Sequence, residues 1–316
     1  MATEGSTKAV VAALLANSGI AVTKFLAFLL TGASSMLAES IHSVADSGNQ
    51  ALLLLGGRRS RRAPSEEHPF GYGRERYVYA FIVSIVLFSV GGLFALYEAY
   101  HKAHELHRAH GHPHDSLLDS RWAWVPIVVL LAAIVMEGLS FRTAIREADR
   151  VRGEASFVQF VRRAKGPELP VILLEDFAAL CGLVFALLGV GLSLLTSNLW
   201  WDVVGTALIG LLLVVVAVVL GVETKSLLLG EGASAAAVRR IVDAVDSTDG
   251  IDGVVHLKTM HLGPDELLVA AKIAVPPEAT ARAIAEAIDA AEAAIRAVEP
   301  IARVIYLEPD IARVPS

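Results

Sequence analysis

The sequence predicts an α-helical membrane protein with six transmembrane helices, followed by a C-terminal cytoplasmic α+β domain. Hydrophobic residues make up 54% of the 316 residues and the mean hydropathy is +0.56, values typical of integral membrane proteins. Six apolar stretches are long enough to cross about 30 Å of hydrocarbon. Beyond about Gly230 the apolar stretches give way to short amphipathic segments. We therefore expect a membrane domain over 1–229 and a cytoplasmic domain over 230–316.

The six predicted spans lie near 9–30, 34–56, 78–100, 122–143, 170–194 and 200–222. The connections after the second and fourth spans are rich in arginine. Because positively charged loops stay in the cytoplasm, both basic loops and both termini are predicted to be cytoplasmic. The tryptophans then fall at the outer interface, where an aromatic belt is expected: Trp122, Trp124, Trp200 and Trp201.

The C-terminal segment predicts the element order αββαβ, a ferredoxin-like arrangement with its helices on one face of a sheet. The helices are expected over 233–251 and 278–298, and the strands over 254–263, 266–275 and 302–309. A domain of about 80 residues buries little surface and is marginal by itself. We therefore expect this domain to dimerise.

A polar stripe in the second span is the main functional signal. At about 100° per residue, Glu39, His42, Asp46 and Asn49 fall within a sector of roughly 80° on one helix face. An ionisable residue at bilayer depth costs on the order of 2.5–3.5 kcal/mol, so three in one span indicate a function. His42 and Asp46 are four residues apart and are both zinc-ligand types, which predicts half of a metal site. The alternative is a buried polar contact that holds helices together.

Composition excludes several other classes of protein. A net charge of −6 argues against a nucleic-acid partner. The single cysteine, Cys181, excludes a disulfide framework and a Cys-based zinc site. The chain has no HExxH motif and no Ser–His or Cys–His pair at one depth, so a membrane metalloenzyme is disfavoured and no prosthetic group is expected.

Residues 32–80, GASSMLAESIHSVADSGNQALLLLGGRRSRRAPSEEHPFGYGRERYVYA, resemble the signature of the cation diffusion facilitator family. The resemblance is to the branch that contains the mitochondrial zinc exporter and its bacterial relatives. It implies a homodimeric transporter that exports a divalent cation, usually Zn²⁺, in exchange for protons. We expect its location to be a bacterial inner membrane. It also implies a transport site between the second and fifth spans, with His42 and Asp46 as its HxxxD motif.

The fifth span departs from the family pattern, because it carries Glu175 and Asp176 in place of a second HxxxD motif. Adjacent helical residues point about 100° apart, so only one of the two is expected to face the stripe. We expect Asp176 to be the firmer ligand. The set is then completed by Glu175, or by Glu39 or a water. A His with several carboxylates also suits Mn²⁺, Fe²⁺ or Co²⁺, and a non-transporting sensor or scaffold stays an alternative.

Other charged residues receive weaker predictions. His68, in the loop after the second span, either captures a cation on its way to the site or is an ordinary loop residue. Lys24 is expected to lie near the outer end of the first span and to extend toward the interface. Glu137 is expected to pair with Arg142, although a proton relay is the alternative. Asp202 is expected to be a helix-start residue.

Histidines outside the spans give two further hypotheses. Six of them occupy the outer loop and suit either weak multivalent metal binding or incidental binding: His101, His104, His107, His110, His112 and His114. In the C-terminal domain, His256 and His261 would point to opposite sides of a strand. With Tyr306 where the family suggests a histidine and only Glu308 nearby, a regulatory metal site there is expected to be weak or absent.

Overall fold

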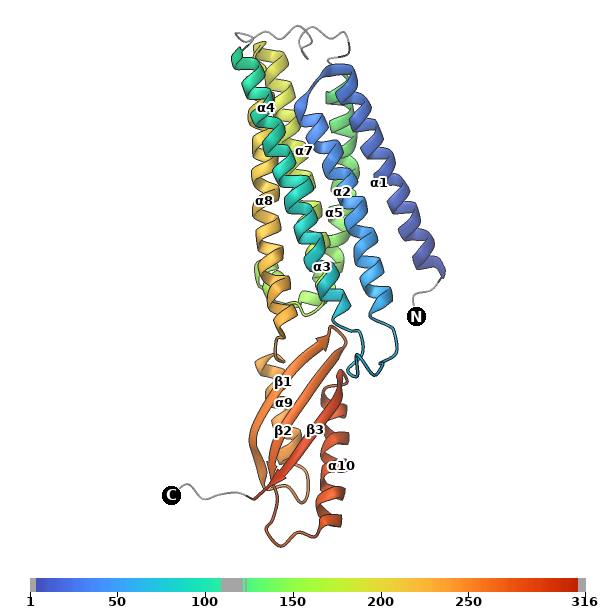
Figure 1. The fold of residues 1–316 in the computed structure, drawn as a ribbon, viewed down its shortest axis with the longest axis vertical. Coiled ribbons are helices and arrows are strands. Elements are labelled where there is room, and N and C mark those ends of the chain that lie inside the picture. Colours follow the sequence, from blue (N-terminus) through green and yellow to red (C-terminus); the bar gives the residue numbers. More distant parts are fainter. Residues whose placement is uncertain (1–3, 109–121, 123, 312–316) are drawn as a thin grey trace. The chain divides into compact units, whose positions relative to one another are not determined.

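The computed structural model describes residues 4–108, 122 and 124–311, which form two compact units (Figure 1). The first unit comprises Met1–Gly56 and Val78–Thr224, and the second comprises Gly57–Tyr77 and Lys225–Ser316. The connector after the second helix therefore groups with the C-terminal segment, whereas the sequence placed it within the membrane domain. The final three histidines of the outer loop lie outside the described residues.

Long helices that run up and down form the first unit (Figure 1). A π-helical segment, η1, joins α3 and α4 into one long helix. The helices, some of whose ends belong to the second unit, are α1 (Glu4–Thr31), α2 (Ser34–Arg59), α3 (Glu75–Val86), η1 (Leu87–Leu93), α4 (Phe94–Arg108), α5 (Val125–Arg152), α6 (Phe157–Arg163), α7 (Glu168–Thr196) and α8 (Trp200–Leu229).

Four helical segments of the described chain are long and apolar enough to cross a membrane. They correspond to the third to sixth predicted spans: Glu75–Arg108, Val125–Arg152, Glu168–Thr196 and Trp200–Leu229. The apolar helical segment Ser18–Thr31 of α1 is shorter, and α2 is less apolar because it carries the polar stripe. A helical membrane domain is thus confirmed, whereas the count of six spans stays a prediction.

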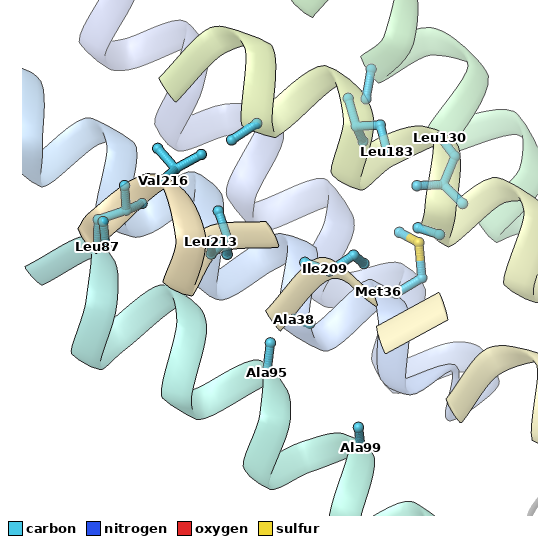
Figure 2. Close-up of a cluster of buried hydrophobic side chains, with 14 of the residues drawn as sticks. Met36, Ala38, Leu87, Ala95, Ala99, Leu130, Leu183, Ile209, Leu213 and Val216 are labelled. Atoms are coloured by element: carbon cyan, nitrogen blue, oxygen red, sulfur yellow. The ribbon is translucent and has the colours of Figure 1, made fainter. Parts of the chain in front are cut away.

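The helices approach one another closely at glycines. A Cβ atom at Gly189 of α7 would lie 2.9 Å from the carbonyl oxygen of Trp201, and one at Gly205 of α8 would lie 2.9 Å from that of Phe185. Figure 2 shows part of the apolar core of this unit, with Met36 near Leu130 and Leu183. Large apolar side chains on the outer faces of the helices remain exposed, as expected for surfaces that contact lipid.

The second unit contains the predicted αββαβ order. Its elements are α9 (Ala235–Asp246), β1 (Gly253–Gly263), β2 (Glu266–Ala274), α10 (Ala281–Val298) and β3 (Ala302–Asp310). The sheet order is β1-β2-β3, with β1 antiparallel and β3 parallel to the central strand. A parallel pair needs a long crossover, which α10 provides.

One face of the sheet carries the core of this unit. Alternate residues of β2 are buried, from Leu267 to Ile273, and they pack against Ile241 of α9 and Ile295 of α10. Ser234 and Thr280 cap the two helices by accepting hydrogen bonds from backbone N–H groups three residues on. The predicted fold of the C-terminal domain is therefore confirmed.

The connector Gly57–Tyr77 packs on the β1–β2 hairpin within the second unit. A Cβ atom at Gly73 would lie 2.8 Å from the carbonyl oxygen of Leu262. The Arg74 guanidinium lies 3.1 Å from the Met260 sulfur, and Arg76 donates to Asp265 at 2.7 Å. The connector is thus held by backbone contact as well as by side chains.

Candidate functional site

The polar stripe of α2 faces the interior of the helical unit. Glu39, His42 and Asn49 are at most 1% exposed, and Asp46 is 13% exposed. The helix begins directly after the two-residue turn at Gly32–Ala33, so its first residues are held at one end of the bundle. A regular helix through this segment places all four side chains on one face, as the spacing predicts.

His42 and Asp46 form the centre of the stripe. His42 Nδ1 lies 3.4 Å from Asp46 Oδ1. In the described structure, however, the two imidazole nitrogens and this carboxylate oxygen make no hydrogen bond. Leaving a buried polar atom unpaired costs about 1–3 kcal/mol. Three such atoms at one point indicate groups arranged for a ligand rather than for the fold.

The acidic pair of α7 is divided between two neighbouring helices. The Asn49 amide of α2 donates to Glu175 Oε1 at 2.7 Å, whereas the Ser140 hydroxyl of α5 donates to Asp176 Oδ2 at 2.9 Å. The prediction that only one of the two faces the stripe holds for these hydrogen bonds. However, Glu175 and not Asp176 is the residue that hydrogen-bonds the stripe.

Glu137 of α5 belongs to the same polar region. It lines a small pocket with Ile20, Ser43 and Asp46. The expected ion pair between Glu137 and Arg142 is wrong, because the described residues show no such contact. Arg142 is five positions after Glu137, which turns it about 140° away from the face of α5 that carries Glu137.

Lys24 was predicted to extend toward the interface, and this prediction is also wrong. Its side chain is 1% exposed, and Nζ lies 3.0 Å from Glu39 Oε2 and 2.9 Å from Ser43 Oγ. The sequence contains a signal for this pairing. Lys24 lies eight residues before Gly32, while Glu39 and Ser43 lie six and ten residues after Ala33, so the helical hairpin places them at one depth.

Asp202 has a role that sequence reasoning identified only in part. It lies in the first turn of α8, as expected, but it is 2% exposed and caps the start of α2. Its carboxylate accepts from Ser34 N and Ser34 Oγ at 2.8 Å each, and also from the Ser35 hydroxyl. A carboxylate suits a helix N-terminus, where backbone N–H groups lack partners.

These side chains do not yet form a complete metal site. Among the described residues, no three His, Cys, Asp or Glu side chains are grouped closely enough to hold a metal ion. His42 and Asp46 therefore offer two ligands, while each acidic residue of α7 is held by a neutral donor. A complete tetrahedral set would require the α7 carboxylates to exchange those donors for the metal.

The remaining predicted site residue, His68, is exposed in the second unit. Its ring contacts Tyr72 edge-on with centroids 4.7 Å apart, and its backbone exchanges hydrogen bonds with Ser65. A role in capturing a cation remains a prediction. On α4, the described histidines His101 and His104 are exposed and stack on tyrosines.

The C-terminal unit contains no obvious metal cluster among its described residues. His256 is exposed and His261 is 4% exposed. The strand that carries them has register shifts beside both positions, so their placement on opposite sides stays a prediction. Lys272 of β2 lies 3.0 Å from Glu308 and 3.3 Å from Asp310. The hydrogen bond to Glu308, with that to Asp310, raises the pKa of Lys272.

Comparison with known proteins identifies the class and then the family. Residues 10–229 match the cation efflux transmembrane domain, and residues 233–310 match the cytoplasmic domain of cation efflux proteins. The helical fold and these matches define the class of multi-pass membrane proteins that carry a cation efflux domain followed by a cytoplasmic domain. The chain belongs to the cation efflux family, which confirms the family predicted from residues 32–80.

Individual relatives support the same family. The chain is 32% identical over 273 residues to the proton-coupled zinc antiporter SLC30A9, mitochondrial, of Xenopus laevis, covering 85% of this chain and 47% of that protein. It is 27% identical to metal tolerance protein C4 of Arabidopsis thaliana, covering 85% of this chain and 57% of that protein. It is 24% identical to the magnetosome protein MamM of Paramagnetospirillum magneticum, covering 89% and 81%. The chain spans about half the length of the first of these relatives.

A solved structure of a variant of the MamM CTD is 26% identical and covers 26% of this chain and 100% of that chain, with a TM-score of 0.25.

Proposed function

We propose that this chain exports Zn²⁺ in exchange for protons by alternating access. We further propose that it does so as a homodimer with six transmembrane helices, both termini in the cytoplasm and a bacterial inner membrane as its location. The observation that carries the proposal is the buried His42–Asp46 pair, whose imidazole nitrogens make no hydrogen bonds. Neutral imidazole and carboxylate are both ligands of Zn²⁺.

The acidic residues of α7 complete the proposed site. Glu175 and Asp176 are buried and accept hydrogen bonds from Asn49 and Ser140, both of which are neutral donors. A divalent cation between α2 and α7 would replace these donors with a stronger electrostatic partner. His42, Asp46, Asp176 and Glu175 are therefore the proposed transport ligands.

Proton exchange follows from the chemistry of the same ligands. Imidazole and carboxylate bind a metal only when deprotonated, so metal binding releases protons and protonation releases the metal. In the inward-facing state, Zn²⁺ from the cytoplasm displaces protons from His42 and the carboxylates. In the outward-facing state, protons from the outside displace Zn²⁺. The name of the SLC30A9 relatives, proton-coupled zinc antiporter, supports the proposal that zinc is exchanged for protons.

A second candidate function is transport of a harder cation. The proposed set has one nitrogen ligand and several carboxylates, and Glu137 adds a further carboxylate beside Asp46. Carboxylate-rich sites also suit Mn²⁺, Fe²⁺ and Co²⁺. Imidazole in a small buried site favours Zn²⁺, which is why zinc stays the first candidate.

Uptake assays with reconstituted protein distinguish these alternatives. Inside-out proteoliposomes would be loaded with a metal-sensitive dye and titrated with Zn²⁺, Mn²⁺, Fe²⁺ and Co²⁺ under one proton gradient. We expect saturable uptake with Zn²⁺ giving the highest kcat/KM. A higher value for Mn²⁺, Fe²⁺ or Co²⁺ would assign the second candidate. No uptake of any of the four would favour the non-transporting sensor or scaffold.

A further inference from the structure

The buried ion pair between Lys24 and Glu39 has no role in the proposed transport cycle. Lys24 is 1% exposed and Glu39 is fully buried, and their charged atoms lie 3.0 Å apart. Burying both charges in a membrane domain is costly, and a well-packed apolar pair often serves stability equally well. The position of this pair beside the proposed site suggests a function other than stability.

Lys24 lies at the edge of the proposed transport site. Glu39 is three residues before His42 on the same helix face, and Ser43, which Lys24 also contacts, lines the pocket with Asp46 and Glu137. The Lys24 ammonium contacts Glu39 and Ser43, which flank His42 on α2, so its positive charge lies beside the proposed ligands. It therefore influences the site directly, although it contributes no ligand.

The balance of charges around the site indicates how the Lys24 ammonium affects cation binding. Five carboxylates lie in the stripe or on the helices beside it: Glu39, Asp46, Glu137, Glu175 and Asp176. Among the described residues, Lys24 is the only lysine or arginine that forms an ion pair with any of them. The affinity of a cation site rises with the number of charged ligands, and a transport site must also release its cation.

We propose that Lys24 sets the metal affinity of the site by acting as a tethered cation that withholds Glu39 from the transported metal. The second oxygen of Glu39 packs near Gly182 of α7, so the carboxylate is already inside the region between α2 and α7. Without the ammonium group, this carboxylate becomes an additional ligand. Metal is then bound more tightly and released more slowly. This inference rests on the proposed function, because it concerns the same site.

Three substitutions test the inference by calorimetric titration of full-length protein with Zn²⁺, together with uptake into proteoliposomes. Lys24→Met should tighten Zn²⁺ binding by about tenfold or more, equivalent to about 1.4 kcal/mol, and lower kcat. The double variant Lys24→Met with Glu39→Gln should return the Kd to within about threefold of wild type. Lys225→Met removes an exposed lysine of α8 and is the control, with no expected change.

The remaining outcomes separate this inference from a purely structural role of the pair. If Lys24→Met does not fold, the single variant Glu39→Gln tests the inference, because the carbonyl oxygen of the glutamine amide still accepts a hydrogen bond from Lys24. The inference expects Zn²⁺ binding within about threefold of wild type in Glu39→Gln. A loss of about tenfold or more would make Glu39 a ligand and would overturn the inference, as would a folded Lys24→Met variant with unchanged Kd. Failure of the wild type to bind or transport any metal would instead reject the proposed function.

Discussion

Hydrogen bonds between Asp202 and the first residues of α2 fix the position of the stripe within the bundle. Asp202 of α8 accepts hydrogen bonds from the backbone and side chains of Ser34 and Ser35, the first residues of α2. This is a helix cap provided by another helix, since the residues just before α2 offer no acidic side chain. It fixes α2 to α8 at the end of the bundle that carries the turn between α1 and α2.

We therefore expect a substitution of Asp202 to lower the stability of the protein. Asp202→Ala should lower the free energy of unfolding by about 2 kcal/mol, because several buried donors lose a charged acceptor. Thermal unfolding followed by tryptophan fluorescence in detergent measures this change. Asp149→Asn, which alters an exposed ion pair on α5, is the control and should change stability by less than about 0.5 kcal/mol. An unchanged Tm in Asp202→Ala would contradict the capping role.

At this scale, the sequence predicted the buried polar stripe but not the residues that contact it. His42, Asp46 and Asn49 follow from helical spacing alone, because all are on one element. Lys24 was expected to extend toward the interface and Glu137 to pair with Arg142, and both predictions were wrong, since these contacts depend on which helices pack together. The choice between Glu175 and Asp176 likewise depends on the rotation of α7, which the spacing of two adjacent residues does not determine.

At the scale of elements, α7 and α8 pack through glycines that leave no room for a side chain. A Cβ atom at Gly189 would meet the carbonyl oxygen of Trp201 at 2.9 Å, and backbone atoms move only with their helix. Gly191, two residues further along α7, has nothing within 4 Å of its Cβ position. The two glycines thus form a matched pair on a single helix.

Alanine at these two positions should give opposite results. Gly189→Ala should destabilise the protein by about 1–3 kcal/mol, as overpacking does, because α7 and α8 must separate. Gly191→Ala should be neutral or stabilising by up to about 1 kcal/mol, since alanine favours a helix. Thermal unfolding of the two variants in one detergent makes the comparison. Equal Tm values would argue against the close crossing.

The elements themselves were largely predictable from sequence. Long apolar runs predicted the helices of the first unit, and two strand-like segments on either side of the GPDE turn predicted the hairpin of the second. The π-helical segment Leu87–Leu93 and the docking of the connector on the β1–β2 hairpin were not predictable. Both depend on tertiary packing, which local pattern does not contain.

At the scale of the whole molecule, the C-terminal unit is the expected centre of assembly. The sheet has one face covered by α9 and α10, whereas His256, Lys258 and Tyr306 on its strands are exposed. A domain of this size gains stability by burying further surface against a second copy. We expect the full-length protein to be a dimer in detergent, measured by mass photometry or cross-linking. A monomer at micromolar concentration would contradict this expectation.

The central claim is that His42 and Asp46 bind the transported metal, and proton flux tests it most directly. Wild-type protein, His42→Ala and Asp46→Ala would be reconstituted into proteoliposomes that contain a pH-sensitive dye, and Zn²⁺ would be added outside. We expect Zn²⁺-driven proton flux in the wild type and its loss in both variants, because each variant removes a ligand from the site that exchanges metal for protons. Full flux in both variants would contradict metal binding by His42 and Asp46.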